Sequence, residues 1–245
     1  RARTVKTMGL IRLDKFLSGQ MPQVSRSDAA RLCKKGEIKV NGVKALSPAL
    51  KIDPAADSVE WGDRKILYKK HLYIMLNKPA GVVCATRDGI SKTVMELLPQ
   101  HLRRQGLFPA GRLDKDTEGF VLITDDGELA HRMLSPKSHV PKTYFVRLEK
   151  ELENDVKDAF LGGVTLEDGT VCKPAELEIY DKKNECTVVL TQGMYHQIKR
   201  MFEAVGNRVV YLKRIKIGGV WLDKSLPEGG VRELGNDEIQ SLILT

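Results

Sequence analysis

The spacing of apolar residues in the first quarter of the chain predicts two short helices followed by a hairpin. Apolar side chains first recur at the i, i+3, i+4 spacing of an amphipathic helix, at Leu13, Phe16 and Leu17. Ser25 can cap a second helix, with Asp28 completing an approximate capping box, and Gly36 can end it. Residues 38–44 alternate between apolar and polar on either side of an Asn-Gly pair, which favours a tight hairpin.

Beyond residue 70, apolar runs separated by turn residues predict a sheet with accompanying helices. Strands are predicted at residues 72–76, 82–86, 120–124, 142–148, 164–172, 175–180 and 186–191. Helical patterns closed by proline or glycine cover residues 128–134 and 151–161. The charged residues 63–70 are the expected linker between this body and the N-terminal part.

A further amphipathic helix is predicted just before Gly206. Its apolar stripe follows the i, i+3, i+4, i+7 spacing, at Ile198, Met201, Phe202 and Val205. On a helical wheel Lys199 lies at the edge of this stripe, whereas Arg200 points nearly opposite to it. We therefore expect Lys199 to reach inward.

The positive charge is concentrated at the N-terminal end. The formal net charge is +8, and residues 1–70 hold 16 Lys and Arg against 7 Asp and Glu, so the rest of the chain is close to neutral. A basic segment ahead of a balanced one suggests a module that grips nucleic acid, attached to a body with another task. A solvated, lysine-rich surface is the alternative that charge alone leaves open.

Composition disfavours several other classes of protein. The four cysteines are scattered, without CxxC pairs or a His-Cys cluster, which argues against zinc sites and disulfides. No apolar run has the length of a membrane span and no signal-peptide pattern is present, so we expect a soluble, cytoplasmic protein with no membrane partner. The basic opening, residues 1–7, is expected to be an expression remnant or a disordered arm.

The densest group of chemically capable residues lies at residues 108–127, ahead of a short apolar run. Three glycines permit sharp turns here, namely Gly111, Gly119 and Gly127. One interpretation is a calcium site, because acids match the spacing of an EF-hand loop at Asp114, Asp116, Glu118 and Asp125. Such a loop needs a helix on both sides, which the neighbouring pattern does not favour. The other interpretation is a single catalytic carboxylate, Asp114, on a loop leading into a buried strand.

The string GRLDKDTEGFVLITDDG in this stretch resembles the signature of the pseudouridine synthases, in particular the RsuA group acting on small-subunit ribosomal RNA. Further strings resemble motifs of the same family, namely MLNKPAGVVCAT, the Lys-x-Tyr ending at Tyr144, HQIK ending at Lys199, and the tail string RIKIGG. The resemblance implies that Asp114 is the essential catalytic residue. It also implies that Tyr144 lies against the target uracil and that Lys199 pairs with Asp114.

Physical chemistry supports these roles. A carboxylate in a water-poor pocket has its pKa raised by desolvation, so a nearby cation is needed to keep it ionised. A tyrosine on a flipped base replaces lost stacking, although a strand tyrosine without the resemblance is more often part of the core. Arg112 is expected to fill the gap left by the extruded nucleotide. His196 is expected to be structural or an RNA contact, not a metal ligand, because no carboxylate or cysteine pattern accompanies it. The turn at residues 78–81 is expected to be structural.

The basic N-terminal part resembles the ribosomal-protein-S4-like domain through the strings RLDKFL, SRSDAARLCKKGEIKVNG and IDPAADSVEW. That domain binds structured RNA by its shape and its phosphates, with little reading of bases. The residues expected to contact RNA are Arg12, Lys15, Arg26, Arg31, Lys34, Lys35 and Lys39, together with Arg112 and Arg200 in the body. A plain surface role stays open for each of them.

These patterns predict an α+β protein of two domains. A small helical and hairpin RNA-binding domain is expected at residues 10–68, and a catalytic domain on a mixed, largely antiparallel sheet at residues 71–245. We expect a monomeric enzyme that isomerises a uridine of ribosomal RNA, preferably of the small subunit. No cofactor or metal is expected, since dinucleotide, phosphate-loop and zinc motifs are absent from the sequence. A large-subunit target or a non-catalytic assembly factor are the alternatives.

Overall fold

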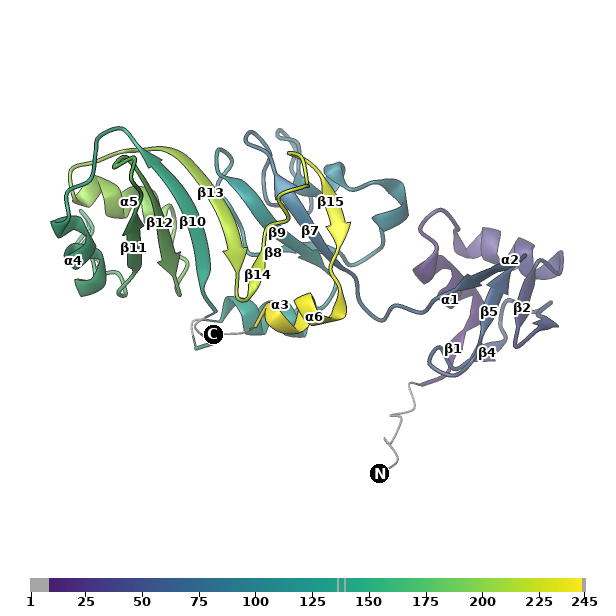
Figure 1. Cartoon of the computed structure of the whole chain (residues 1–245). Coiled ribbons are helices and arrows are strands. Elements are labelled where there is room, and N and C mark those ends of the chain that lie inside the picture. The colour runs from purple at the N-terminus through teal and green to yellow at the C-terminus, as the bar shows by residue number, and fades with distance from the viewer. Residues whose placement is uncertain (1–8, 136, 139, 244–245) are drawn as a thin grey trace, which may run out of the picture. The chain divides into compact units, whose positions relative to one another are not determined.

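The computed structural model describes residues 9–135, 137–138 and 140–243 (Figure 1). The expected N-terminal arm therefore lies outside the described residues. The chain divides into two compact units, of which the first runs to His71 and also includes Leu98–Gly106. Arg104 in this returning segment donates hydrogen bonds to the carbonyl groups of Lys69 and Lys70, which ties it to the first unit.

The first unit begins with the two predicted helices, α1 (Leu13–Gln20) and α2 (Arg26–Lys34). The Ser25 hydroxyl accepts from the backbone of Asp28, whose carboxylate accepts in return from the Ser25 backbone, so the predicted capping box is present. The apolar faces of both helices are buried in one core with the neighbouring strands. Local sequence signals therefore fix the start and the orientation of these helices.

A small antiparallel sheet of order β3-β2-β5-β6 completes this unit, beside a pairing of β1 with β4. The strands are β1 (Ile11–Arg12), β2 (Ile38–Val40), β3 (Val43–Lys44), β4 (Lys51–Ile52), β5 (Val59–Trp61) and β6 (Arg64–Ile66). The Asn-Gly hairpin is confirmed, with positive φ at Asn41 and Gly42. The linker prediction is wrong at β6, because Gly62 has a φ of +59° and turns the chain back along β5.

The second unit is built on a long sheet of order β11-β12-β10-β13-β9-β7-β15, with β8 beside β9 and β14 beside β13 (Figure 1). Its strands are β7 (Tyr73–Lys78), β8 (Phe108–Ala110), β9 (Glu118–Thr124), β10 (Lys142–Leu148), β11 (Glu176–Ile179), β12 (Glu185–Leu190), β13 (Val209–Ile217), β14 (Val220–Trp221) and β15 (Val231–Glu233). Within the described residues, β9 and β13 pair in parallel and the other strand pairs of this sheet are antiparallel. The sheet is therefore mixed and largely antiparallel, as predicted.

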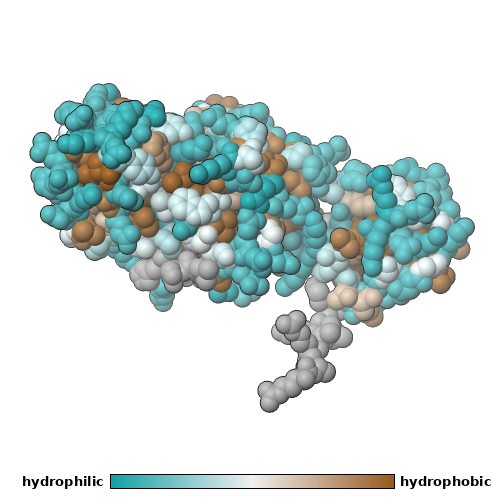
Figure 2. All heavy atoms as spheres, viewed as in Figure 1, coloured by the Kyte–Doolittle hydropathy of each residue, from teal (hydrophilic) through white to brown (hydrophobic). Residues whose placement is uncertain are grey.

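Helices cover the sheet and close two apolar cores. They are α3 (Gly127–Leu134), α4 (Asp155–Gly162), α5 (Gln197–Ala204) and α6 (Asn236–Ser241), with short 3-10 turns η1 (Val94–Leu97) and η2 (Gln100–Leu102), the latter in the first unit. Phe160 of α4 and Phe202 of α5 pack in one core with β10 and β12, whereas Met133 of α3 packs in another with β7 and β9. The visible face of each unit is mostly hydrophilic, with small apolar patches (Figure 2).

Three local predictions are wrong in this unit. Residues 82–86 form no strand, because β9 and β15 already occupy both edges of β7. The stretch 164–172 is reduced to a single bridge between Thr165 and Val171. Gly127 makes no sharp turn and is the first residue of α3, whereas Gly111 and Gly119 do have positive φ.

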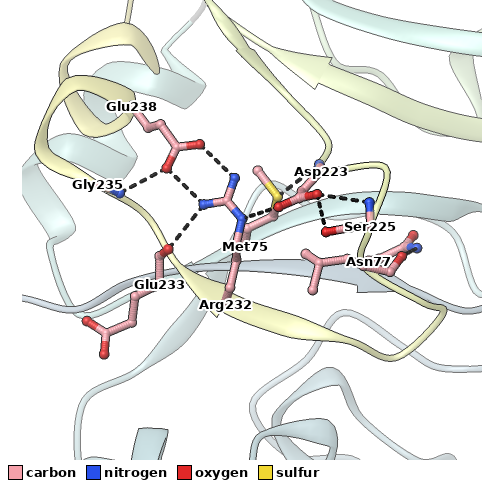
Figure 3. A network of polar contacts seen from close by, with 9 residues as sticks. Met75, Asn77, Asp223, Ser225, Arg232, Glu233, Gly235 and Glu238 are labelled. Atoms are coloured by element: carbon pink, nitrogen blue, oxygen red, sulfur yellow. Dashed lines mark hydrogen bonds and ion pairs between the residues drawn. The ribbon is translucent and has the colours of Figure 1, made fainter.

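The C-terminal segment is fastened to the sheet by a network around Arg232 (Figure 3). Its guanidinium donates to Asp223 at 2.7 Å and to both oxygens of Glu238 at 2.9 and 2.7 Å. Glu238 also accepts from the backbone of Gly235, which caps α6. The network links β15 and α6 to the loop that follows β14.

Within the described ranges, no helix is long and apolar enough to cross a membrane.

Candidate active site

The site is built around the loop that joins β8 to β9 and carries Asp114. The loop leads into Gly119, the second residue of β9, whose φ is +103° and whose neighbour on β13 is Arg214. A Cβ atom on this glycine would lie 2.2 Å from the Arg214 carbonyl oxygen. Only glycine lets β9 enter the sheet directly beside β13. Gly119 therefore allows the loop that carries Asp114 to join the sheet at the β9–β13 pair.

Lys78 holds the loop through the backbone carbonyl groups of the loop. The sequence alone places this residue only in a structural turn. Its side chain is fully buried, and its ammonium donates to the carbonyl groups of Pro79, Lys115 and Thr117 at 3.0, 3.1 and 2.6 Å. Burial lowers the pKa of Lys78. A lysine that ends an apolar strand run just before proline was the available signal. Lys78 thus binds the backbone on both sides of Asp116, at Lys115 and at Thr117.

Arg214 was also missed, although its string resembled a family motif. The side chain is buried, with Nε donating to the Phe120 carbonyl at 2.7 Å and Nη2 to the Gly111 carbonyl at 3.1 Å. It therefore joins the start of the loop to the strand that follows it. Charged donors satisfy buried carbonyl groups more strongly than neutral ones. The loop around Asp114 is thus held by one buried cation at each side.

The loop brings Asp114 to Lys199 on α5, as the resemblance implied. Lys199 Nζ lies 3.3 Å from Asp114 Oδ2 and donates to the two oxygens of Asp116 at 2.7 and 2.9 Å. The side chains of Lys199 and Asp114 are 21% and 27% exposed, so the pair is partly accessible to solvent. Two carboxylates thus share one ammonium.

The electrostatics of this cluster favour the charged forms. Burial acts to lower the pKa of Lys199, but the hydrogen bond to Asp116 and the charge of Asp114 outweigh it, and its pKa is raised. Burial likewise acts to raise the pKa of Asp116, but the hydrogen bond from Lys199 prevails and lowers it. The ammonium of Lys199 and the carboxylate of Asp116 therefore stay ionised at neutral pH.

His196 lies at this site, which the sequence did not indicate. Its Nε2 is 3.5 Å from Asp114 Oδ1, so a carboxylate does accompany the histidine, contrary to the premise of the sequence interpretation. The residue precedes α5 in the left-handed conformation, with a φ of +49°. Its ring stacks on that of Tyr195, with centroids 3.8 Å apart. Within the described residues, no group of His, Cys, Asp or Glu could hold a metal ion.

Tyr144 is brought to the same part of the sheet by strand register. It lies opposite Arg214, which in turn lies opposite Gly119 near the start of β9. The ring is half-buried and packs on the core to which α5 contributes. The predicted face is confirmed, because Val146 and Leu148 on the same side of β10 are buried in that core. No hydrogen bond joins Tyr144 to Asp114 in the part of the chain that the structure describes.

The calcium interpretation fails on structure. The loop lies between the strands β8 and β9, whereas an EF-hand loop lies between helices. Asp116 is engaged by Lys199, and Glu118 accepts a hydrogen bond from the Tyr211 hydroxyl at 2.6 Å. These acids therefore serve the protein's own hydrogen bonds.

The expected RNA contacts fall into both units. Six of the seven in the first unit are exposed, and Lys39 is half-buried. Arg112 is exposed beside Asp114, while Arg200 is half-buried and paired with Asp168. The sequence missed Asp14, a buried residue that accepts from Arg12 at 2.9 Å and from Arg26 at 3.1 Å. Hydrogen bonds from Arg12, aided by Arg26, hold the pKa of Asp14 at about 2 against the opposing effect of burial.

Comparisons with known proteins agree with this arrangement. The profile of the RNA pseudouridylate synthase family matches residues 72–204, and that of the S4 domain matches residues 11–57. The ribosomal small subunit pseudouridine synthase A of Escherichia coli K12 is 41% identical over 234 residues, covering 95% of this chain and all of that relative. An uncharacterized RNA pseudouridine synthase of Bacillus subtilis strain 168, YtzG, is 43% identical over 95% of this chain and 98% of its own. A crystal structure of a pseudouridylate synthase, 39% identical, superposes with a TM-score of 0.67 over 95% of this chain and 99% of that one.

The chain joins a basic RNA-binding unit to a sheet, and a loop of this sheet carries a carboxylate paired with a lysine. Together with the comparisons, these features define an RNA-modifying enzyme. The chain belongs to the RNA pseudouridylate synthase family, with an S4 domain ahead of the synthase domain. The predictions of the family, the fold class and the enzyme class are confirmed.

Proposed function

We propose that this protein converts one uridine of small-subunit ribosomal RNA into pseudouridine, with Asp114 as the catalytic carboxylate. The observation that carries the proposal is the ion pair of Asp114 with Lys199 on the loop formed by the family motif. Similarity over nearly the full length to ribosomal small subunit pseudouridine synthases A supports the choice of substrate. The protein would act as a monomer in the cytoplasm, on free RNA or on an assembling small-subunit particle.

The reaction is an isomerisation whose atoms balance without a co-substrate. The bond from uracil N1 to ribose C1′ breaks, a bond from C5 to C1′ forms, C5 releases its proton and N1 gains one. Asp114 would act by attacking the ribose or the base to form a covalent adduct, or by promoting elimination to a glycal. Lys199 would keep the carboxylate charged and oriented along either route. Tyr144 would stack on the extruded uracil and assist removal of the C5 proton.

The remaining predicted residues would bind RNA. Arg112 would fill the gap left by the extruded uridine, because it is exposed next to Asp114 and a guanidinium can both stack and pair with phosphate. The basic residues of the first unit would grip phosphates, which positions the RNA without reading its sequence. Arg200 would contribute from α5, in competition with its present partner Asp168.

The test is direct mapping of the product. Unmodified small-subunit ribosomal RNA, with and without bound ribosomal proteins, is incubated with the protein and pseudouridine is mapped by carbodiimide labelling and primer extension. We expect one new stop, which disappears with Asp114→Asn and persists with Asp181→Asn, an exposed acid in the turn after β11. A stop found only in large-subunit RNA would overturn the substrate. Tight binding without any stop would leave an RNA-binding assembly factor.

A further inference from the structure

The aromatic ring of Tyr195 is presented to solvent beside the proposed active site. It is 76% exposed, and its ring lies on that of His196 with centroids 3.8 Å apart and planes 19° apart. An exposed tyrosine is in itself ordinary. What distinguishes this one is that one face of the ring is covered by a side chain that reaches Asp114.

The turn that carries the two rings is held by hydrogen bonds of the buried residue Gln197. Gln197 is 4% exposed, accepts from the Met194 backbone at 3.1 Å and donates to the Gln192 side chain at 3.3 Å. His196 has a left-handed backbone that a residue other than glycine keeps only where its surroundings impose it. Gln197 also begins α5, whose apolar face is buried. The position of Tyr195 is therefore set by the same helix that positions Lys199.

The rings form a short stack that begins at the proposed catalytic carboxylate. His196 Nε2 is 3.5 Å from Asp114 Oδ1, and the ring of Tyr195 stacks on the imidazole. A further planar group would extend this stack on the open face of Tyr195. Among the described residues His196 contacts Asp114 and Tyr195 does not, so a base on the Tyr195 ring would belong to a nucleotide next to the reacting one.

We propose that the open face of Tyr195 binds the base of a nucleotide that flanks the target uridine. The inference rests on the proposed function, because it takes Asp114 as the place where the uridine reacts. Extruding a uridine deprives its neighbour of a stacking partner, and an aromatic ring restores that contact whatever the identity of the base. Unpaired bases of structured RNA are commonly held in this way.

A spectroscopic test reads the stack without catalysis. The Tyr195→Trp substitution is made in protein that carries Asp114→Asn, and its emission is compared with that of Asp114→Asn alone, because Trp61 and Trp221 also emit. We expect the added indole to be quenched when small-subunit ribosomal RNA binds, with binding measured separately by anisotropy of labelled RNA. RNA that binds without changing this emission would overturn the inference, while pseudouridine formation by the unsubstituted protein would still stand.

Kinetics provide the second readout. Tyr195→Ala is expected to lower kcat/KM by about 5- to 150-fold, the range expected for one lost base stack. Tyr195→Phe keeps the ring and should stay within about twofold of the unsubstituted protein. Tyr180→Ala is the matched control, because this tyrosine follows the edge strand β11, several strands from β9. Equal losses in Tyr195→Phe and Tyr195→Ala, with unchanged melting temperatures, would refute stacking as the role of the ring.

Discussion

Lys199 lies closer to Asp116 than to Asp114. Its ammonium donates to both oxygens of Asp116, at 2.7 and 2.9 Å, and is 3.3 Å from the nearest oxygen of Asp114. Asp116 therefore anchors the lysine, and Asp114 receives the positive field without a tight hydrogen bond. A carboxylate held in this way still has oxygen lone pairs to offer to a substrate.

Removing the ammonium should disable the site in a pH-dependent way. Lys199→Met leaves two neighbouring carboxylates without a counter-cation, and their mutual repulsion and partial burial favour protonation. We expect the single-turnover rate at neutral pH to fall at least about 100-fold, with the acidic limb of the rate profile moved to higher pH. Lys199→Arg, which keeps the charge, should leave that limb in place. An unshifted profile in Lys199→Met would show that the lysine acts otherwise.

Asp116 should act as a positioning residue for Lys199. Asp116→Asn keeps one acceptor oxygen but loses the charge, so the ammonium would move onto Asp114 and occupy the oxygens that the reaction needs. We expect the single-turnover rate to fall about tenfold, equivalent to about 1.4 kcal/mol in the barrier, with RNA affinity unchanged. Glu96→Gln in η1, outside this cluster, is the control for loss of one acid in the same unit. A rate equal to that of the unsubstituted protein would contradict the role.

The first unit offers a separate prediction about affinity. Buried Asp14 holds the guanidinium groups of Arg12 and Arg26 side by side, although 49% and 60% of those side chains remain exposed. Asp14→Asn would release both, so we expect the RNA dissociation constant to rise about 3- to 10-fold, with the rate at saturating RNA unchanged, because phosphate contacts supply affinity without chemistry. Asp63→Asn, an exposed acid in the same unit, should alter neither quantity. A lower saturating rate in Asp14→Asn would place this pair in catalysis.

How far the sequence reached depended on the range of the interactions. Helical periodicity and capping predicted α1, α2 and α5, and the wheel of α5 placed Lys199 at the inner edge of its stripe, because these features are set within a few residues. The roles of Lys78 and Arg214 depend on carbonyl groups of distant segments, which no local pattern contains. Likewise, residues 82–86 have the composition of a strand, but the neighbours of β7 are decided by the whole sheet.

Gly119 should be irreplaceable, whereas Gly127 should not. Gly119→Ala places a methyl group 2.2 Å from a backbone carbonyl oxygen of β13 at a φ of +103°, so either the strand pair or the loop must shift. We expect at least about 3 kcal/mol of lost stability, or failure to fold, in urea denaturation. Gly127→Ala meets no heavy atom within 4 Å and lies at the start of a helix, so it should be neutral or slightly stabilising. Similar effects of the two substitutions would contradict this assignment.

Lys142 should make stability increase with pH above neutrality. Its ammonium donates to the Met133 carbonyl at 3.3 Å, and burial first, then the charge of Arg214, lower its pKa to about 8. The unfolded chain keeps this proton up to about pH 10.4. Between these two values the unfolded state binds more protons than the folded state, so the free energy of unfolding rises with pH. At neutral pH, by contrast, the folded protein carries the cost of a partly buried charge.

The comparison of this protein with Lys142→Met isolates that contribution. In urea denaturation at pH 7, 8, 9 and 10, the free energy of unfolding of the unsubstituted protein should rise relative to that of the variant, by about 1 kcal/mol across the series. The expected value is small because the side chain retains some contact with solvent. Lys183→Met, which removes an exposed lysine, should differ from the unsubstituted protein by the same amount at every pH. The opposite outcome is a difference in the free energy of unfolding between the protein and Lys142→Met that stays constant or shrinks as the pH rises. That result would mean that Lys142 keeps its proton in the folded state, so that Lys142 and Arg214 are both charged in the sheet.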